Sequence, residues 1–170
     1  DISGATGINY TPTSADLGGA GTWYVVCTST PTCGSAVISN EVTVVVSTAN
    51  TWLTYKGSTS WNTPGNWSCG SPVSGSDVII PSGGTQPVLT TNITVGNITL
   101  NGSISIASTT LTINGTITGS GTLTGSSSSN LTIGGIALNQ VLNFTQTSAA
   151  TRSLNNLTLN SLSSATLGSD

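Results

Sequence analysis

The stretch GNITLNGSISIASTTLTINGTITGSGTLTG, residues 96 to 125, decides the fold class of this chain. In short runs, aliphatic residues alternate with Thr or Ser, and each run ends near Gly or Asn. Alternation with a period of two is typical of a β-strand with one buried face, whereas Gly, Asn and Ser favour turns. The stretch therefore predicts a series of short β-strands, each with an aliphatic inner face and a hydroxyl-bearing outer face.

Strands of this kind recur, imperfectly repeated, from residue 87 to residue 170. GNITLN at 96–101 matches NNLTLN at 155–160, and LTING at 111–115 matches LTIGG at 131–135. Such repetition predicts a right-handed parallel β-helix, in which successive rungs stack and bury their aliphatic residues. At about 20 residues per rung, the segment supplies about four rungs. The same alternation permits a second β-sandwich, which is the alternative fold.

The composition indicates an all-β chain and argues against two classes of function. Of the 170 residues, 35% are hydrophobic and 4% are charged, Ser, Thr and Asn together number 73, and the formal charge is −3. No window places apolar residues at helical spacing between capping residues, so we expect essentially no α-helix. The chain has no run of about 18 apolar residues and no basic cluster. Neither a membrane span nor nucleic-acid binding is therefore expected.

Residues 20–47 predict a β-hairpin that carries two of the three cysteines. GTWYVVCTS and SNEVTVVVS alternate as strands do, and they flank a loop that contains Pro and Gly. Cys27 and Cys33 lie on either side of the segment TSTPT. We predict a disulfide between them and an oxidising, extracellular setting, the alternative being a pair of buried thiols. Cys69 is left over and has no predicted partner.

The chain lacks the side chains on which most catalytic sites depend. It has no His, which excludes a Ser-His or Cys-His nucleophile pair. A glycosidase needs two carboxylates at a fixed separation, and those of this chain are scattered over separate segments. They are Asp1, Asp16, Glu41, Asp77 and Asp170. We expect no catalytic, cofactor-binding or metal-binding residues and no enzymatic activity, and we interpret Asp16 and Asp77 as residues that bond nearby backbone amides.

Threonine and asparagine recur on the outer faces of the predicted strands. Nine Asn-x-Ser/Thr sequons occur, and strands written Asn, aliphatic, Thr, aliphatic generate them without any role in glycosylation. Rows of outward Thr on a β-helix resemble ice-binding surfaces, but here their spacing along the chain is irregular, so we do not expect the matched register of a flat face. The threonines in question are Thr94, Thr99, Thr112, Thr116, Thr118, Thr122, Thr124 and Thr132.

Three tryptophans gather in the segment TWLTYKGSTSWNTPGNWSCG, residues 51–70. Trp52, then Trp61-Asn62 and Asn66-Trp67, are followed by DVIIP and PVL. This pattern resembles the opening module of β-helical regions in large surface adhesins of gliding and biofilm-forming bacteria, which are exported by the type IX secretion route. The preceding residues, from Asp16 through Trp23, Tyr24 and Cys27 to SNEVTVVV, resemble the last strands of immunoglobulin-like surface repeats. The chain departs from the immunoglobulin pattern in that Tyr24 lies three residues before the Cys instead of two.

The resemblance implies three modules in a fragment of a longer extracellular protein of the bacterial cell surface. Residues 1–48 would be the C-terminal half of an immunoglobulin-like domain, 49–86 a Trp-rich cap or junction, and 87–170 β-helix rungs that continue beyond the chain. The implied function is that of a structural and adhesive segment of a surface protein or filament, with a part in cell adhesion or gliding motility. The implied partners are the neighbouring domains and polysaccharide or abiotic surfaces.

The aromatic residues Trp52, Tyr55, Trp61 and Trp67 admit two roles. A β-helix exposes its aliphatic interior at the first rung, and each large ring covers about 150–250 Å² of apolar surface, so the aromatics predict a lid. The alternative is a carbohydrate-binding module that stacks sugars on exposed rings. A third hypothesis is the non-catalytic part of a polysaccharide-degrading enzyme. We expect the lid, because large aromatic residues are highly buried on average.

Overall fold

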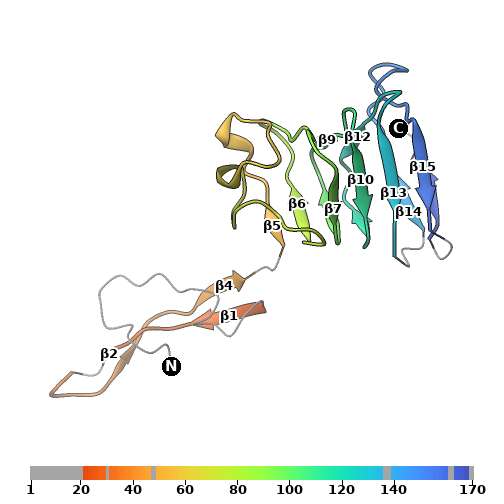
Figure 1. The fold of residues 1–170 in the computed structure, drawn as a ribbon. Coiled ribbons are helices and arrows are strands. Elements are labelled where there is room, and N and C mark those ends of the chain that lie inside the picture. The colour runs from red at the N-terminus through yellow and green to blue at the C-terminus, as the bar shows by residue number, and fades with distance from the viewer. Residues whose placement is uncertain (1–20, 30, 47–48, 136–138, 161–162, 169–170) are drawn as a thin grey trace. The chain divides into compact units, whose positions relative to one another are not determined.

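The computed structural model describes residues 21–29, 31–46, 49–135, 139–160 and 163–168. The described residues form β-strands and two short 3-10 helices, η1 (Thr54–Lys56) and η2 (Pro64–Asn66). The expectation of an all-β chain is therefore confirmed. The chain divides into two compact units, Asp1–Thr48 and Ala49–Asp170, and Figure 1 labels strands of both.

The first unit contains an antiparallel hairpin, as expected. Strand β1 (Gly21–Val25) pairs with β4 (Val42–Val46), and Trp23 lies opposite Val44. Nearer the loop of the hairpin, β2 (Thr28–Ser29) pairs with β3 (Val37–Ile38). Large apolar side chains of this hairpin are exposed, namely Tyr24, Val26, Val37, Ile38 and Val42.

The second unit consists of parallel sheets. One four-stranded sheet contains β7 (Ile93–Val95), β10 (Thr110–Ile113), β13 (Asn130–Ile133) and β15 (Asn156–Leu159), in that order. Another contains β5 (Asn50–Thr51), β6 (Val78–Ile80), β8 (Ile98–Leu100) and β11 (Ile117–Thr118). Two-stranded sheets pair β9 (Ser103–Ser105) with β12 (Thr122–Thr124), and β14 (Gln140–Leu142) with β16 (Ala165–Leu167).

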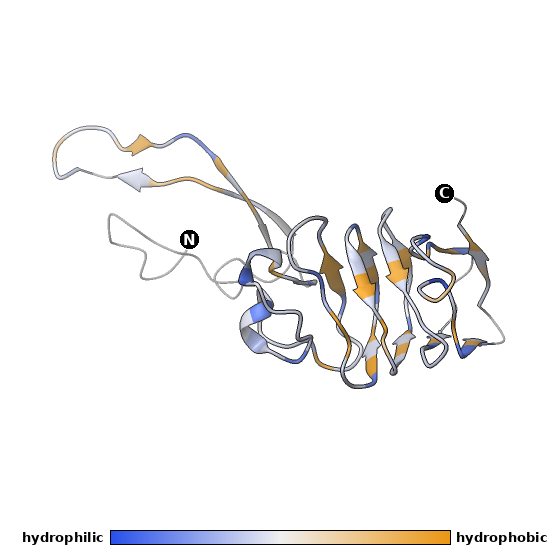
Figure 2. Ribbon diagram, turned by 90° about the horizontal axis from the view of Figure 1, so that it is seen from above, coloured by the Kyte–Doolittle hydropathy of each residue, from blue (hydrophilic) through white to orange (hydrophobic). Residues whose placement is uncertain are grey.

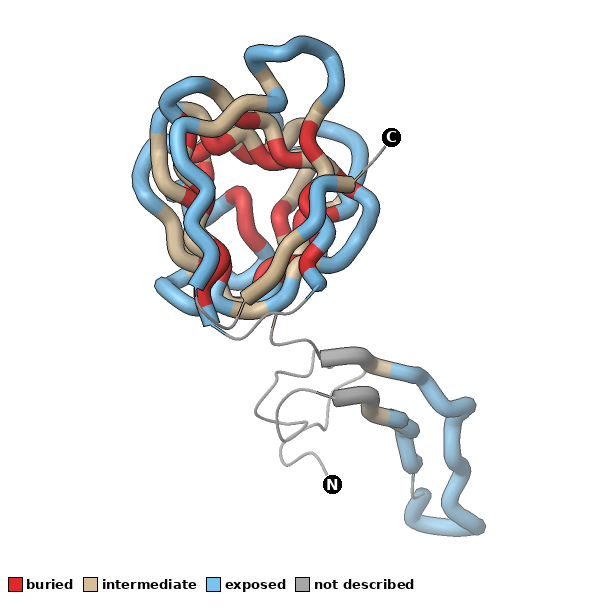
Figure 3. Tube along the Cα trace, turned by 90° about the vertical axis from the view of Figure 1, so that its right-hand side faces the viewer, coloured by how far each residue is buried: buried red, intermediate tan, exposed pale blue. Residues whose placement is uncertain are grey.

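The chain visits these sheets in turn and then returns to each of them. Between β7 and its neighbour β10, for example, lie β8 and β9, which belong to two other sheets. Viewed from the side of its last strands, the second unit encloses an interior lined by buried positions (Figure 3). Its named strands pair in parallel, whereas the hairpins of a β-sandwich pair antiparallel. The parallel sheets are compatible with a β-helix.

Stacked aliphatic side chains hold the parallel sheets together. In the sheet of β7, β10, β13 and β15, one inward column of residues in register is Ile93, Leu111, Leu131 and Leu157, and the next is Val95, Ile113, Ile133 and Leu159. The residues at the centre of both columns are at most 1% exposed. Burying each such side chain contributes about 1.5–3 kcal/mol. Figure 2 shows hydrophobic positions, in orange, within the strands of the second unit.

Polar side chains link the residues that directly precede β6, β8 and β11, three neighbouring strands of one sheet. The Asp77 carboxylate accepts a hydrogen bond from the backbone N–H of Asn97 at 2.7 Å, and the Asn97 side-chain oxygen accepts one from the backbone N–H of Thr116 at 2.9 Å. Gly96 and Gly115 leave room for these side chains, because a Cβ on either residue would meet the oxygen of Asp77 or Asn97. Asp77 bonds a backbone amide, as predicted, but this amide belongs to Asn97, 20 positions along the chain, and not to a neighbouring residue.

Candidate functional site

Three indole rings pack together inside the second unit. Trp52, Trp61 and Trp67 are 1%, 1% and 3% exposed. The Trp67 ring lies between the other two, 5.1 Å from the Trp52 centroid and 4.6 Å from that of Trp61, with both pairs in an edge-to-face arrangement. This is a favoured geometry for aromatic rings. Trp67 Nε1 donates to the backbone oxygen of Trp61 at 2.7 Å, and Trp52 Nε1 donates to that of Thr85 at 2.7 Å.

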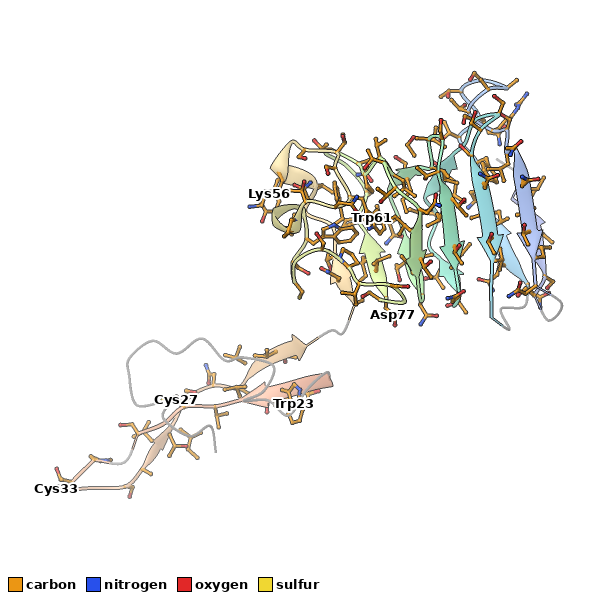
Figure 4. All side chains as sticks on the ribbon, in the orientation of Figure 1. Trp23, Cys27, Cys33, Lys56, Trp61 and Asp77 are labelled. Atoms are coloured by element: carbon orange, nitrogen blue, oxygen red, sulfur yellow. The ribbon has the colours of Figure 1, made fainter. Side chains whose placement is uncertain are left out.

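The aromatic segment also closes the outer edge of β5, the first strand of its sheet. Trp52 and Trp67 form an antiparallel bridge, in which Leu53 N donates to Asn66 O at 2.8 Å and Ser68 N donates to Thr51 O at 2.9 Å. Backbone groups that an edge strand would otherwise present to water are thus paired. The aromatic segment lies at the end of the unit where the parallel strands begin, and Figure 4 labels Trp61 there.

The four aromatic candidates differ in what they present to solvent. The three tryptophan rings are buried and have no free face on which a sugar can stack. Tyr55 is 75% exposed, and the Lys56 ammonium lies 5.0 Å from its ring centroid. A stacking platform needs several exposed, coplanar rings, whereas of these four residues Tyr55 alone is exposed.

The predicted disulfide between Cys27 and Cys33 is wrong. Cys27 and Cys33 are free and exposed, as is Cys69, so the alternative of buried thiols is also wrong. The reason is the register of the hairpin: Ser39, not Cys33, lies across from Cys27, and its N–H donates to the Cys27 oxygen at 2.9 Å. Cys33 lies at the loop end of the hairpin, away from Cys27 (Figure 4).

Charged groups do not assemble into a site in the described parts of the chain. Glu41 is exposed in the first unit, and Asp77 belongs to the second, where it bonds Asn97. Asp1, Asp16 and Asp170 lie outside the described residues. Over the described ranges, no three His, Cys, Asp or Glu side chains come together as a metal site would require. None of the helices among these residues is long and apolar enough to cross a membrane.

A rank of threonines runs across the outer face of one parallel sheet. It consists of Thr94, Thr112, Thr132 and Thr158, which face each other on adjacent strands. The expectation that irregular spacing prevents a matched register was wrong. The four residues are 18, 20 and 26 positions apart in the chain, yet they stack in register, because connecting loops absorb the differences in length. Neighbouring hydroxyl groups are therefore about 4.8 Å apart, the distance between strands.

The threonine rank, as we call these four residues, carries unoccupied hydrogen-bonding groups. Within the described residues, none of its four hydroxyls has a protein partner. Elsewhere the threonines bond each other: Thr118 Oγ1 donates to Thr99 Oγ1 at 3.3 Å, and the Thr124 and Thr145 hydroxyls are 3.0 Å apart. The four strands that carry the rank contain neither charged nor aromatic residues. The rank thus offers hydroxyl and methyl groups only.

Thr158 was missing from the threonines considered in the sequence. Thr158 pairs with Thr132 in the sheet. The similarity of NLTL at 156–159 to NLTI at 130–133 was the sequence signal that could have identified Thr158. Some asparagines of the sequons have a structural role in these strands. Asn130 Oδ1, for example, accepts from the side-chain amides of Asn155 and Asn156 at 3.1 Å, so this sequon residue links neighbouring strands.

Comparisons with family models, with curated proteins and with solved structures found no match to this chain.

Proposed function

We propose that this chain is a structural and adhesive segment of an extracellular bacterial surface protein, with no catalytic activity of its own. The threonine rank carries the proposal. It presents unpartnered hydroxyls at a regular spacing, on strands whose inner side chains are fixed by burial at the centre of the sheet. Surfaces built from repeated hydroxyls, such as polysaccharides and hydrated minerals, are the partners with matching hydrogen-bonding chemistry.

In this proposal the parallel sheets form a right-handed β-helix that serves as a stiff stalk. Crossover connections between parallel strands are right-handed in about 98% of cases. The buried tryptophans seal the end of the stalk where the strands begin, and the hairpin of the first unit belongs to an immunoglobulin-like neighbouring domain. Val42 and Val44 share one face of β4, where Val42 is 60% exposed and Val44 is partly exposed. This apolar face supports the assignment, because the strands of a β-sandwich cover such a face with a second sheet.

Adhesion of this kind depends on many weak contacts. A hydrogen bond that replaces one to water contributes about 0.5–1.5 kcal/mol, so one rank of four threonines binds weakly. Repeated copies on a filament or a cell raise the overall affinity through their high effective concentration. Because the rank is uncharged, its binding is insensitive to ionic strength, unlike adhesion through opposite charges.

Retention on insoluble polysaccharide particles tests the proposal. The double variant Thr112→Val and Thr132→Val removes two central hydroxyls and keeps the β-branched shape that suits a strand. The matched control is Thr99→Val with Thr118→Val, on a different sheet. We expect the first variant to lose retention several-fold, the control to keep it, and salt between about 0.05 and 1 M to have little effect. Equal retention by the two variants would rule the threonine rank out as the adhesive surface.

Ice binding is a second candidate, favoured by the matched register of the threonine rank. Ordered water is also a lattice of hydroxyl groups, and a flat row of methyl and hydroxyl groups suits it. Growth of ice crystals in a frozen suspension distinguishes the two surfaces. If the chain arrests crystal growth and the variant Thr112→Val with Thr132→Val does not, ice is the partner. Unaltered crystal growth in the presence of the unmodified chain removes this candidate.

A further inference from the structure

A groove of about 340 Å³ crosses three successive passes of the chain around the parallel sheets. We call it the corner groove, because it lies where the sheet of β6, β8 and β11 meets the sheet of β9 and β12. Each pass contributes three lining residues, namely Ser82, Gly83 and Gln86, then Asn101, Gly102 and Ser103, then Ser120, Gly121 and Thr122. The volume is within the range of ligand clefts, about 300–1,000 Å³.

Close contacts between neighbouring passes hold the corner groove in one shape. A Cβ on Gly121 would meet the backbone oxygen of Gly102, and a Cβ on Gly102 would meet the backbone oxygen of Pro81. The Gln86 side chain ties two passes together: its Nε2 donates to the Pro81 oxygen at 3.2 Å, and its Oε1 accepts from the Ser103 N–H at 2.9 Å. The groove is therefore formed before any ligand binds, which lowers the entropic cost of binding.

Four side chains of the corner groove carry hydrogen-bonding groups that the protein leaves free. Within the described residues, no side-chain hydrogen bond is made by Ser82, Asn101, Ser103 or Ser120. A hydroxyl donates and accepts, and a side-chain amide offers two donors and an acceptor. These free groups come from all three passes. A ligand that bonds to several of them must therefore extend along the direction in which the passes stack.

The chemistry of the lining favours an uncharged partner that is rich in hydroxyl groups. None of the nine lining residues is charged or aromatic. An anion would meet no cationic side chain in the groove, and a hard metal ion no carboxylate. An apolar ligand would remove hydroxyl and amide groups from water without replacing their hydrogen bonds. The hydroxyls of a neutral sugar both donate and accept, and every unit of a sugar chain carries them.

We propose that the corner groove binds a short chain of neutral sugar units, laid along the stacking direction of the passes. Neighbouring strands are about 4.8 Å apart, so the first and third passes are separated by about 10 Å. A single sugar unit is too short to contact all three passes, whereas an oligosaccharide can do so. The threonine rank lies on another sheet, that of β7, β10, β13 and β15. The corner groove is thus a second site, which goes beyond the proposed function and does not depend on it.

Titration of the isotopically labelled chain with soluble oligosaccharides tests the proposal. The neutral probes are cellopentaose, maltopentaose and mannopentaose, and the charged comparison is pentagalacturonic acid. We expect saturable NMR shifts in the amides of residues 101–103 and 120–122 with at least one neutral probe, at a Kd on the order of 1 mM. Pentagalacturonic acid should bind roughly tenfold more weakly than that probe, because the groove has no cation to replace the hydration of its carboxylates.

Variants of the chain separate the corner groove from the rest of the hydroxyl-rich surface. Asn101→Ala with Ser120→Ala removes two free groups at exposed positions and should weaken oligosaccharide binding roughly tenfold. The matched control is Ser127→Ala with Ser128→Ala, also at exposed positions but outside the groove, and it should bind as the unmodified chain does. Melting curves confirm that both variants are folded.

Several outcomes would overturn the proposal. They are the absence of shifts at the groove with all the neutral probes, equal binding by the two double variants, and equal binding of pentagalacturonic acid. Thr112→Val with Thr132→Val should leave oligosaccharide binding unchanged, and a loss of binding in this variant would assign the sugar to the threonine rank instead. Retention on insoluble particles is measured separately, so the proposed function and the corner groove succeed or fail independently.

Discussion

Replacing Trp67 by Ala is the most direct way to distinguish a structural lid from a sugar-binding platform. The Trp67 ring is 3% exposed and makes edge-to-face contacts with both Trp52 and Trp61. Its Nε1 donates to the Trp61 backbone oxygen at 2.7 Å. The substitution therefore opens a cavity between two other buried rings and removes a hydrogen bond. If the cluster is a lid, the damage falls on stability.

The size of the effect follows from the burial. A buried Trp covers about 150–250 Å² of apolar surface, worth about 4–6 kcal/mol at about 25 cal/mol per Å². Alanine retains part of this, and measured replacements of buried Phe or Trp by Ala cost about 3–5 kcal/mol. We expect about 4 kcal/mol, which lowers the melting temperature of a unit of this size by roughly 15 °C. Trp67→Phe keeps most of the ring burial and should cost about 1–2 kcal/mol.

Urea denaturation followed by circular dichroism measures these differences, with Tyr55→Ala as the matched control. Tyr55 belongs to the same segment and is 75% exposed, so its loss should cost less than about 0.5 kcal/mol. The lid interpretation is refuted if Trp67→Ala and Tyr55→Ala have the same stability. It is also refuted if Trp67→Ala remains as stable as the unmodified chain and loses binding to a soluble glycan.

Three further predictions concern the Asp77 carboxylate, the close approach at Gly115 and the thiols. Asp77→Ala removes the acceptor for the Asn97 amide and should lower stability by about 1 kcal/mol, whereas Asp77→Asn keeps an acceptor and should cost less than half of that in urea denaturation. Gly115→Ala places a Cβ against the Asn97 side chain and should cost about 1–3 kcal/mol, and an unchanged melting curve would contradict this close approach. Cys27 and Cys33 should each react with a thiol reagent counted by mass spectrometry, and a melting temperature that falls on addition of reductant would contradict free thiols.

Much of the fold follows from the period of the sequence. Alternation over two residues predicts which side chains face inward, and Leu111, Ile113, Leu131 and Ile133 are indeed buried. The shared pattern of LTING and LTIGG predicts that their strands are equivalent, and β10 and β13 pair in parallel. The lid hypothesis also came from composition, since large rings are scarce in this chain and gather where the repeats begin.

The matched register of the threonines could not be predicted from their spacing in the sequence. Spacings of 18, 20 and 26 residues describe the path of the chain around each pass, including loops, whereas register depends only on where the strands meet. The disulfide prediction failed for a related reason. It assumed that two cysteines flanking a loop face each other, but the strands extend only to Ser29 and Val37, and Cys33 lies within the loop.

Parallel, in-register stacking also accounts for the composition of the chain. When each pass places a residue on its counterpart from the previous pass, a charge that recurs in the repeat faces a like charge about 4.8 Å away. Two such charges repel by about 1 kcal/mol in water and by several kcal/mol near a protein surface. A hydroxyl or a side-chain amide both donates and accepts, so it is compatible with a copy of itself, as Thr99 and Thr118 or Asn130 and Asn156 show. The low content of charged residues, 4%, is therefore a consequence of the architecture, and the neutral hydroxyl surface follows from it. Under the proposed function, a ligand of this surface is recognised by hydrogen bonds and methyl contacts and not by charge, which is the chemistry that a solid lattice of hydroxyl groups offers.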